Sequence, residues 1–317
     1  MKKIIILTLS LFATLFVYAH GGGNMIHSNI KASMTEDDKL AVLMVHFGTT
    51  HADTRAVTID ALNTLAAEAF SDTEIREAYT SRVVIRRLGQ QDIVKLNPAE
   101  ALEQLHADGY THLLIQSSGV IDGVEMESLR RNVWDAAPMF KDIRLGDPLL
   151  FEPQDYETVI DALTEGTEKE KAYVLVGHGT YDASTAQYAM LDYLFKAKGH
   201  ANFFVGTLEG YPGQEEVMNQ LAASGLKEVV LVPFLFVAGD HAKNDIAGDW
   251  KEAFENAGYT VDVRLQGLGE NATIRNLYIR HLRYLVGHKK LDILERKAGF
   301  QSGEVDYDHE KGEYHHH

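Results

Sequence analysis

The stretch "EVVLVPFLFVAGDH" (residues 228–241) begins as a continuous apolar run and ends in a glycine, an aspartate and a histidine. An apolar run without alternation predicts a strand buried on both faces, as in a parallel sheet, and we place that strand at 228–237. Similar runs are "LAVLMVHF" (40–47), "THLLIQSS" (111–118), "AYVLVGHG" (172–179) and "HANFFVGTLEG" (200–210). Amphipathic helical patterns separate these runs, so we expect an α/β fold built on doubly wound parallel sheets.

Segments in the first part of the chain also resemble segments in the second part. "VLMVHFGTT" (42–50) matches "YVLVGHGTY" (173–181), and "LLIQSSGVIDGVE" (113–125) matches "VVLVPFLFVAGDH" (229–241) without a gap. These matches predict two similar halves that face each other across a cleft. The alternative is that any two α/β units share such strand–loop–glycine patterns. The expected divisions are a linker at 20–38, an N-terminal half at 39–171, a C-terminal half at 172–290 and a flexible tail at 291–317.

The N-terminus has the pattern of a secretory signal peptide. Lys2 and Lys3 precede the apolar segment Ile4–Val17, and small residues suit cleavage after Ala19. The alternative is an uncleaved anchor, but the apolar run is shorter than the roughly 20 residues that span a bilayer. We therefore expect residues 1–19 to be removed from an exported, periplasmic protein with no stable membrane insertion after cleavage.

Composition excludes several classes of protein. The 317 residues carry a formal net charge of −16 and no cysteine. Such acidity argues against a nucleic-acid partner, because phosphate binding needs a cationic face. The lack of cysteine excludes disulfides and thiolate metal ligands. Neither a Walker A loop nor a G-x-G-x-x-G motif after a strand is present, so we expect no nucleotide cofactor.

Ligands of open α/β sheets bind beyond the carboxyl ends of the strands. In the C-terminal half, His178, Glu209 and His241 follow three consecutive predicted strands, so we expect them to lie side by side. Two imidazoles and a carboxylate are typical ligands of divalent first-row metals, and such a set accepts Co2+, Fe2+, Ni2+ or Zn2+. Each residue taken alone also fits a hydrogen-bonded structural role at a strand end.

Two further features concern the N-terminal half. The internal match sets Glu125 at the position of His241, so Glu125 is expected to face the metal site from the other half. The segment "TSRVVIRRLGQQ" (80–91) groups Arg82, Arg86 and Arg87. These arginines fit either a solvated helix face or a cationic rim for substrate carboxylates, because guanidinium groups pair with carboxylates through two parallel hydrogen bonds.

A set of motifs together resembles one enzyme family. The motifs are "HFGTTHADTR" (46–55), "AYTSRVVIRRL" (78–88), "QSSGVIDGVE" (116–125), "VGHGT" (176–180), "TLEGYP" (207–212), "VAGDHAKNDIAGD" (237–249) and "GLGEN" (267–271). Over roughly residues 40–290 the chain resembles the anaerobic, CbiK-type sirohydrochlorin cobaltochelatases. These are class II chelatases related in fold to ferrochelatase.

The resemblance implies insertion of Co2+, as the substrate metal, into the tetrapyrrole sirohydrochlorin without ATP, in cobalamin biosynthesis. The family's metal-binding His, Glu and His fall on His178, Glu209 and His241. The expected export resembles that of the periplasmic branch of the family. Some members of this branch bind haem and form larger oligomers, so the resemblance is compatible with a homo-oligomer. Cytoplasmic relatives often carry a histidine near the position of Gly119. This chain has none there, so no haem ligand is assigned.

The chemistry needs a base as well as a metal site, because two N–H protons leave the macrocycle as the ion enters. We expect His178 to act as ligand and proton acceptor, since a neutral imidazole suits that role near pH 7. Glu125 relays protons or holds the ring in this interpretation, and is a surface carboxylate in the alternative. Two competing functions are an exported carrier of haem, another tetrapyrrole or metal without turnover, and a solute-binding protein.

Overall fold

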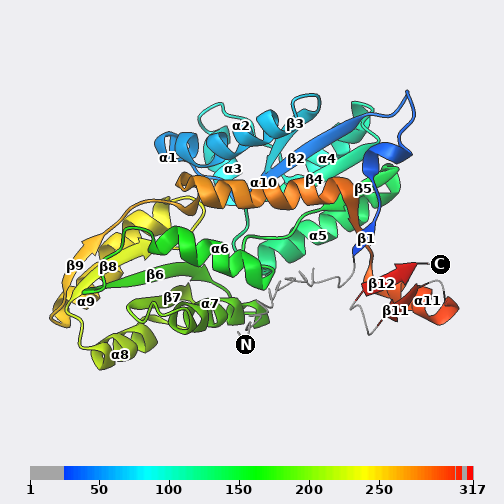
Figure 1. Ribbon diagram of the computed structural model, residues 1–317. Helices are drawn as coiled ribbons and strands as arrows, with labels where there is room; N and C mark the ends of the chain where they lie inside the picture. The colour runs from blue at the N-terminus through cyan, green and yellow to red at the C-terminus, as the bar shows by residue number, and fades with distance from the viewer. Residues whose placement is uncertain (1–24, 304, 309–312, 317) are drawn as a thin grey trace, which may run out of the picture. The chain divides into compact units, whose positions relative to one another are not determined.

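The computed structural model describes residues 25–303, 305–308 and 313–316 (Figure 1). The predicted signal peptide at 1–19 lies outside these residues. The chain divides into two compact units, of which His27–Lys289 forms the main unit. Of the described residues, Met25, Ile26 and those from Lys290 onward belong to the other unit. Within the described residues, no helix combines the length and apolar character that crossing a membrane requires.

The main unit contains two four-stranded parallel sheets, which confirms the predicted α/β fold with two similar halves (Figure 1). The first half carries the sheet in the order β3-β2-β4-β5, and the second half carries β7-β6-β8-β9. The first sheet consists of β2 (Leu40–His46), β3 (Glu74–Tyr79), β4 (His112–Ser117) and β5 (Asp142–Leu145). The second consists of β6 (Lys171–Gly179), β7 (Phe203–Glu209), β8 (Glu228–Pro233) and β9 (Thr260–Val263).

The strand registers of the two sheets correspond. Val42 pairs with Leu114 in the first sheet, and Tyr173 pairs with Val230 in the second. The two internal sequence matches bring these same residues into correspondence. The similarity of the halves therefore extends from strand order to individual residue positions.

Helices cover both faces of each sheet. The first half contains α1 (Ala52–Val57), α2 (Ile59–Ala69), α3 (Arg82–Gly89), α4 (Pro98–Ala107), α5 (Val124–Ala136), η2 (Ala137–Met139) and α6 (Pro153–Thr164). The later helices are η3 (Ala183–Thr185), α7 (Ala186–Ala197), α8 (Gln214–Ser224), the π-helix η4 (Ala242–Trp250), α9 (Lys251–Asn256), η5 (Leu268–Glu270) and α10 (Ala272–Gly287).

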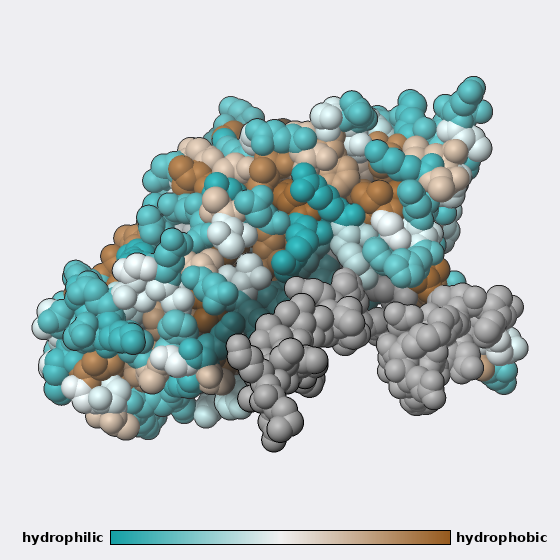
Figure 2. All heavy atoms as spheres, viewed as in Figure 1, coloured by the Kyte–Doolittle hydropathy of each residue, from teal (hydrophilic) through white to brown (hydrophobic). Residues whose placement is uncertain are grey.

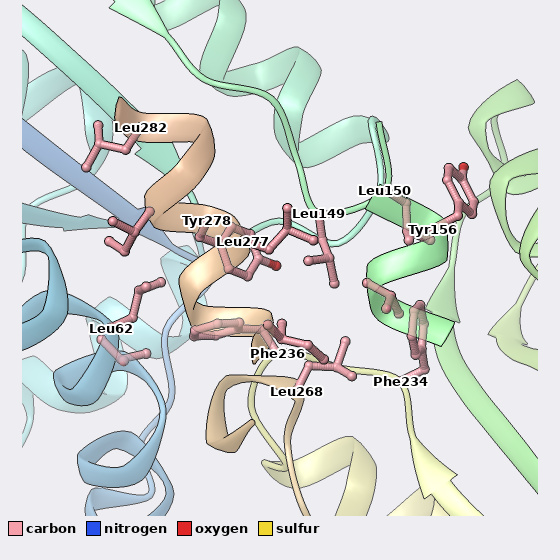
Figure 3. Packing of buried hydrophobic residues seen from close by; sticks show 14 of the residues in the cluster. Leu62, Leu149, Leu150, Tyr156, Phe234, Phe236, Leu268, Leu277, Tyr278 and Leu282 are labelled. Atoms are coloured by element: carbon pink, nitrogen blue, oxygen red, sulfur yellow. The ribbon is translucent and has the colours of Figure 1, made fainter. Parts of the chain in front are cut away.

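One face of each sheet contributes to a core shared by the two halves. Because side chains alternate along a strand, Val42 and Met44 point to this shared core while Leu43 and Val45 point to a separate cluster under α4 and α5. Figure 3 shows the shared core, in which Phe236, following β8, lies near Tyr278 of α10. On the face drawn in Figure 2, hydrophilic residues predominate and apolar residues are scattered among them.

Helix α10 lies within the expected C-terminal half at 172–290, and it packs against β4, α2 and α6 of the first half. The reason is its apolar stripe, which includes the buried Leu277 and Leu282. The guanidinium of Arg144, also buried, donates to the backbone oxygen of Leu285 at 2.8 Å and so pairs a carbonyl at the end of α10.

The expected linker and tail also contain regular structure. Residues 25–38 include β1 (Met25–His27) and η1 (Ile30–Ser33), and the Ile30 side chain is fully buried. Beyond β10 (His288–Lys290), the expected flexible tail contains α11 (Ile293–Ser302), which Asp292 caps with its carboxylate. It also contains β11 (Val305–Asp308) and β12 (Glu313–His316), which pair antiparallel. Local capping and strand pairing thus order segments whose apolar pattern is weak.

Candidate functional site

Two of the three predicted ligands lie on neighbouring strand ends. His178 is the penultimate residue of β6 and Glu209 is the last residue of β7, and Gly179 pairs with Glu209 between these strands. Gly179 has a φ of +83°, and a Cβ there would lie 1.6 Å from the Glu209 backbone oxygen. Only glycine therefore permits the two strand ends to approach this closely.

His241 reaches the same place from β8 by an irregular segment. The sequence predicted a strand through Val237, but β8 ends at Pro233. The chain then leaves the sheet because Phe234 and Phe236 are buried in the shared core, where the Phe236 ring stacks on His46 at 6.1 Å between centroids. This segment delivers His241 to the start of η4.

The structure brings His178 and His241 together. Their ring centroids are 4.9 Å apart and the ring planes are nearly perpendicular, at 87°. The Nδ1 atom of His178 lies 3.2 Å from the Gly179 oxygen, and that of His241 lies 2.6 Å from Oδ2 of Asp245. Because a carbonyl or carboxylate oxygen only accepts, each Nδ1 carries the proton and each Nε2 keeps a free lone pair. Both imidazoles can therefore bind a metal through Nε2.

The Glu209 side chain differs from the two histidines in its contacts. Its side chain is exposed, and no hydrogen bond or ion pair connects its carboxylate to another described residue. Among the described residues, no group of three or more His, Asp or Glu side chains is already arranged around one metal position. The paired imidazoles are thus observed, whereas Glu209 as the third ligand stays a prediction.

Glu125 occupies the position that the internal match assigns to it. It is the second residue of α5, after the N-cap Gly123, just as His241 is the second residue after Gly239. A Cβ on Gly123 would lie 3.2 Å from Oγ of Ser184, so the start of α5 contacts the second half. The Glu125 side chain is exposed, and the described residues show no hydrogen bond between it and His178 or His241.

The three arginines on α3 do not share one environment. Arg87 donates to Oδ2 of Asp240 at 3.0 Å, across the two halves. Arg82 and Arg86 are exposed and form no ion pair with another described residue. Only the latter two therefore retain free guanidinium groups for a substrate carboxylate.

Sequence reasoning assigned no role to three residues of this region: His51, Asp240 and Asp245. His51 Nε2 lies 2.7 Å from Oδ1 of Asp240. The hydrogen bond with His51, together with Arg87, lowers the pKa of Asp240, so this carboxylate stays ionised. The signal for Asp245 was available in the sequence, because a carboxylate four residues after a histidine faces it on a helix.

His46, the last residue of β2, is not a free ligand. Its ring is buried and both nitrogens are paired, Nδ1 with Oγ of Ser118 and Nε2 with Oδ1 of Asn63, each at 2.9 Å. Burial lowers the pKa of His46, so the ring is neutral near pH 7. His46 therefore has a structural role at the end of β2.

Comparison with solved structures identifies the fold as that of the α/β chelatases. SirB from Bacillus subtilis with Fe3+ superposes with a TM-score of 0.57 at 16% identity, covering 78% of this chain and 96% of that chain. SirB from Bacillus subtilis subspecies spizizenii in complex with cobalt superposes with a TM-score of 0.53 at 14% identity, covering 78% and 95%.

The sequence narrows this class further. The family model for cobalt chelatase (CbiK) matches residues 40–286. The sirohydrochlorin cobaltochelatase of Salmonella typhimurium is 37% identical over 268 residues, covering 82% of this chain and 99% of the relative. Sirohydrochlorin cobaltochelatase CbiKC of Nitratidesulfovibrio vulgaris is 28% identical over 257 residues, covering 77% and 89%. The chain belongs to the cobalt chelatase (CbiK) family.

Proposed function

We propose that the protein is a sirohydrochlorin cobaltochelatase, which inserts Co2+ into sirohydrochlorin without a nucleotide. The observation that carries the proposal is the pair of imidazoles, His178 and His241, whose ring centroids lie 4.9 Å apart at the edge of the second sheet and whose Nδ1 atoms are hydrogen-bonded, which leaves each Nε2 able to bind a metal. The relatives named as sirohydrochlorin cobaltochelatases support the choice of metal and tetrapyrrole. Imidazole ligands by themselves also accept Fe2+, Ni2+ and Zn2+.

The reaction exchanges one Co2+ for two pyrrole protons. We propose that Co2+ is first held by Nε2 of His178 and His241, with the Glu209 carboxylate offsetting part of its charge. As the ion passes to the ring nitrogens, Nε2 of His178 is released and accepts one of the N–H protons. Glu125, on the other half, relays the second proton to solvent. In this order, the same Nε2 lone pair of His178 binds the metal ion first and accepts a proton afterwards.

The substrate must also be held at its periphery. Arg82 and Arg86 are exposed on α3 and have no ion pair among the described residues, so they fit carboxylates of the tetrapyrrole. Arg87, which is paired with Asp240, is the weakest of the three candidates for that contact.

The direct test follows the absorbance of sirohydrochlorin with Co2+ and purified protein. The expected result is insertion faster than the spontaneous rate, lost in the double variant His178→Ala and His241→Ala. The matched control is His106→Ala, an exposed histidine on α4. A wild-type rate equal to the spontaneous rate would overturn the proposal.

A second candidate is a carrier of haem, another tetrapyrrole or metal that does not turn over. Within this candidate, one observation favours haem or another tetrapyrrole over metal: the described residues contain no preassembled three-ligand metal site, which a carrier of the ring does not need. A carrier would bind sirohydrochlorin tightly and leave the insertion rate unchanged. A solute-binding protein would retain its ligand when both histidines are replaced.

We also propose that the protein is exported to the periplasm, on the basis of the N-terminal pattern at residues 1–19. Expression of the full chain in its native type of cell, followed by fractionation and N-terminal sequencing, tests this. The expected mature N-terminus is His20. A cytoplasmic protein that retains Met1 would contradict it. Size-exclusion chromatography of the mature protein then tests for a homo-oligomer.

A further inference from the structure

A cluster of charged side chains connects the two halves beside His241. Asp240 precedes His241 directly, and its carboxylate reaches two residues of the first half. Oδ1 lies 2.7 Å from Nε2 of His51, and Oδ2 lies 3.0 Å from a guanidinium nitrogen of Arg87. His51 is the N-cap of α1, and Arg87 lies on α3. The carboxylate therefore joins the segment after β8 to two separate helices of the first half.

The contact extends to Lys243 and to the backbone. Nζ of Lys243 lies 3.4 Å from Nδ1 of His51 and 3.9 Å from Oδ2 of Asp53. An ammonium group only donates, so Nδ1 of His51 accepts and its Nε2–H donates to Asp240. A Cβ on Gly239 would lie 3.5 Å from Oγ1 of Thr49, so the backbone itself lies against the first half.

At the start of η4, Ala242 and Ile246 are buried, but among the described residues no polar side chain of this turn forms a hydrogen bond or ion pair with another element of the second half. His241 is the N-cap residue of η4, and its side chain makes no capping hydrogen bond. Its Nδ1 is engaged by Asp245 on the same helix, which orients the ring but does not fix the helix in space. His178, in contrast, is fixed by the strand pairing of β6. The position of one imidazole relative to the other therefore depends on what holds the first turn of η4.

We propose that Asp240, His51 and Arg87 form a clasp that positions His241 for metal binding. Asp240 is a positioning residue, because it acts through the neighbouring His241 and not on the substrate. The first half thereby contributes to the metal site of the second without supplying a ligand. This inference rests on the proposed function for its effect on turnover, but its effect on Co2+ binding can be measured without the tetrapyrrole.

The exposure of the clasp separates positioning from stability. The side chains of Asp240 and Arg87 are 51% and 53% exposed, and ion pairs of this kind contribute little to folding stability. Misplacement of a reacting group by about 1 Å, however, costs on the order of 100-fold in rate. A loss of clasp contacts should therefore reduce Co2+ affinity and insertion rate while the unfolding midpoint changes little.

The experiment is a double-mutant cycle on the mature protein. Asp240→Asn, Arg87→Gln and the combined variant are each titrated with Co2+ alone and then assayed for insertion into sirohydrochlorin. We expect Asp240→Asn to weaken Co2+ binding about 10-fold, and Arg87→Gln to have little further effect once Asp240 is changed. Asp240→Glu, which keeps the carboxylate, should restore most of the affinity. The control is Asp249→Asn, an exposed residue of η4 without an ion pair among the described residues.

Several outcomes would overturn the clasp. Multiplicative losses from Asp240→Asn and Arg87→Gln would show that Arg87 acts elsewhere, such as on a substrate carboxylate, and would overturn the clasp. Equal Co2+ affinity in Asp240→Asn and Asp249→Asn would also overturn it. If Asp240→Asn unfolds, His51→Ala replaces it, with His51→Gln as the rescue that retains a donor. An inactive wild-type protein would refute the proposed function, while the Co2+ titration would still test the clasp.

Discussion

The two halves of the main unit share a topology but place different side chains at equivalent positions. By strand register and internal match, His178, Glu209 and His241 correspond to Phe47, Ser81 and Glu125 in the first half. Ser81 caps α3 by accepting from the Val84 amide, and Phe47 is an exposed ring. The repeated backbone therefore supplies three positions at each sheet edge, and the side-chain types decide that only the second edge offers two imidazoles.

The largest expected effect separates His178 from its counterpart Phe47. His178→Ala removes a ligand and the base, so we expect a loss of 10²- to 10⁴-fold in insertion rate, about the contribution of a general base. Phe47→Ala should leave Co2+ affinity unchanged, because an aromatic ring offers no lone pair to the ion. Titration with Co2+ and the sirohydrochlorin assay measure both. An equal loss of Co2+ affinity in the two variants would contradict the assignment of metal binding to the second half.

The next effect concerns the residue four positions after His241 and after Glu125. In the second half this residue is Asp245, which pairs with His241 Nδ1, and in the first half it is the buried Leu129. Asp245→Ala should weaken Co2+ binding about 10- to 100-fold, because the carboxylate fixes the tautomer and the ring orientation. Asp245→Asn, which keeps an acceptor oxygen, should fall between that variant and wild type. Asp249→Ala is the control, and its loss of affinity would sink the orientation argument.

The similarity of the halves was predictable from sequence, because continuous apolar runs indicate buried parallel strands and the matched strand–loop segments indicate two equivalent units. The path after Pro233 and the placement of α10 were not. A run such as "PFLFV" and an amphipathic helix both indicate burial, but neither states which half supplies the neighbouring surface. Those contacts depend on how the two sheets pack, which periodicity does not encode.

The candidate site, like the fold, was only partly predictable from the sequence. The sequence predicted that His178 and His241 lie close together, because the carboxyl ends of neighbouring parallel strands meet at one edge, but it did not predict the irregular path from Pro233 to His241. The contacts of Asp240 with His51 and Arg87 join residues that are 189 and 153 positions apart, on different halves. Sequence spacing gives no information on such pairs. The sequence therefore indicated Arg87 as a substrate contact and did not predict its ion pair with Asp240.

A smaller effect tests why the first half keeps a histidine at position 46. Burial holds the pKa of His46 below 6.5, so the native ring stays neutral while the unfolded chain takes up a proton below that pH. Stability should therefore fall as pH drops from 6.5, by up to about 1.4 kcal/mol per pH unit from this group. Urea unfolding of wild type and His46→Gln between pH 8 and 5 measures the difference in slope. His106→Gln, on the exposed face of α4, is the control, and a slope that His46→Gln leaves unchanged would contradict the prediction.

The smallest effect contrasts Ser81 with its counterpart Glu209. Ser81→Ala removes the cap of α3, so we expect a loss of about 1 kcal/mol in the free energy of unfolding and no change in Co2+ affinity. Glu209→Gln should do the reverse. Its carboxylate is exposed and makes no hydrogen bond with another described residue, so stability should hold, whereas the loss of negative charge beside the imidazoles should weaken Co2+ binding. Denaturant unfolding and Co2+ titration of both variants complete the comparison. A Glu209→Gln protein with wild-type Co2+ affinity would remove Glu209 from the metal site and leave the two histidines as its protein ligands.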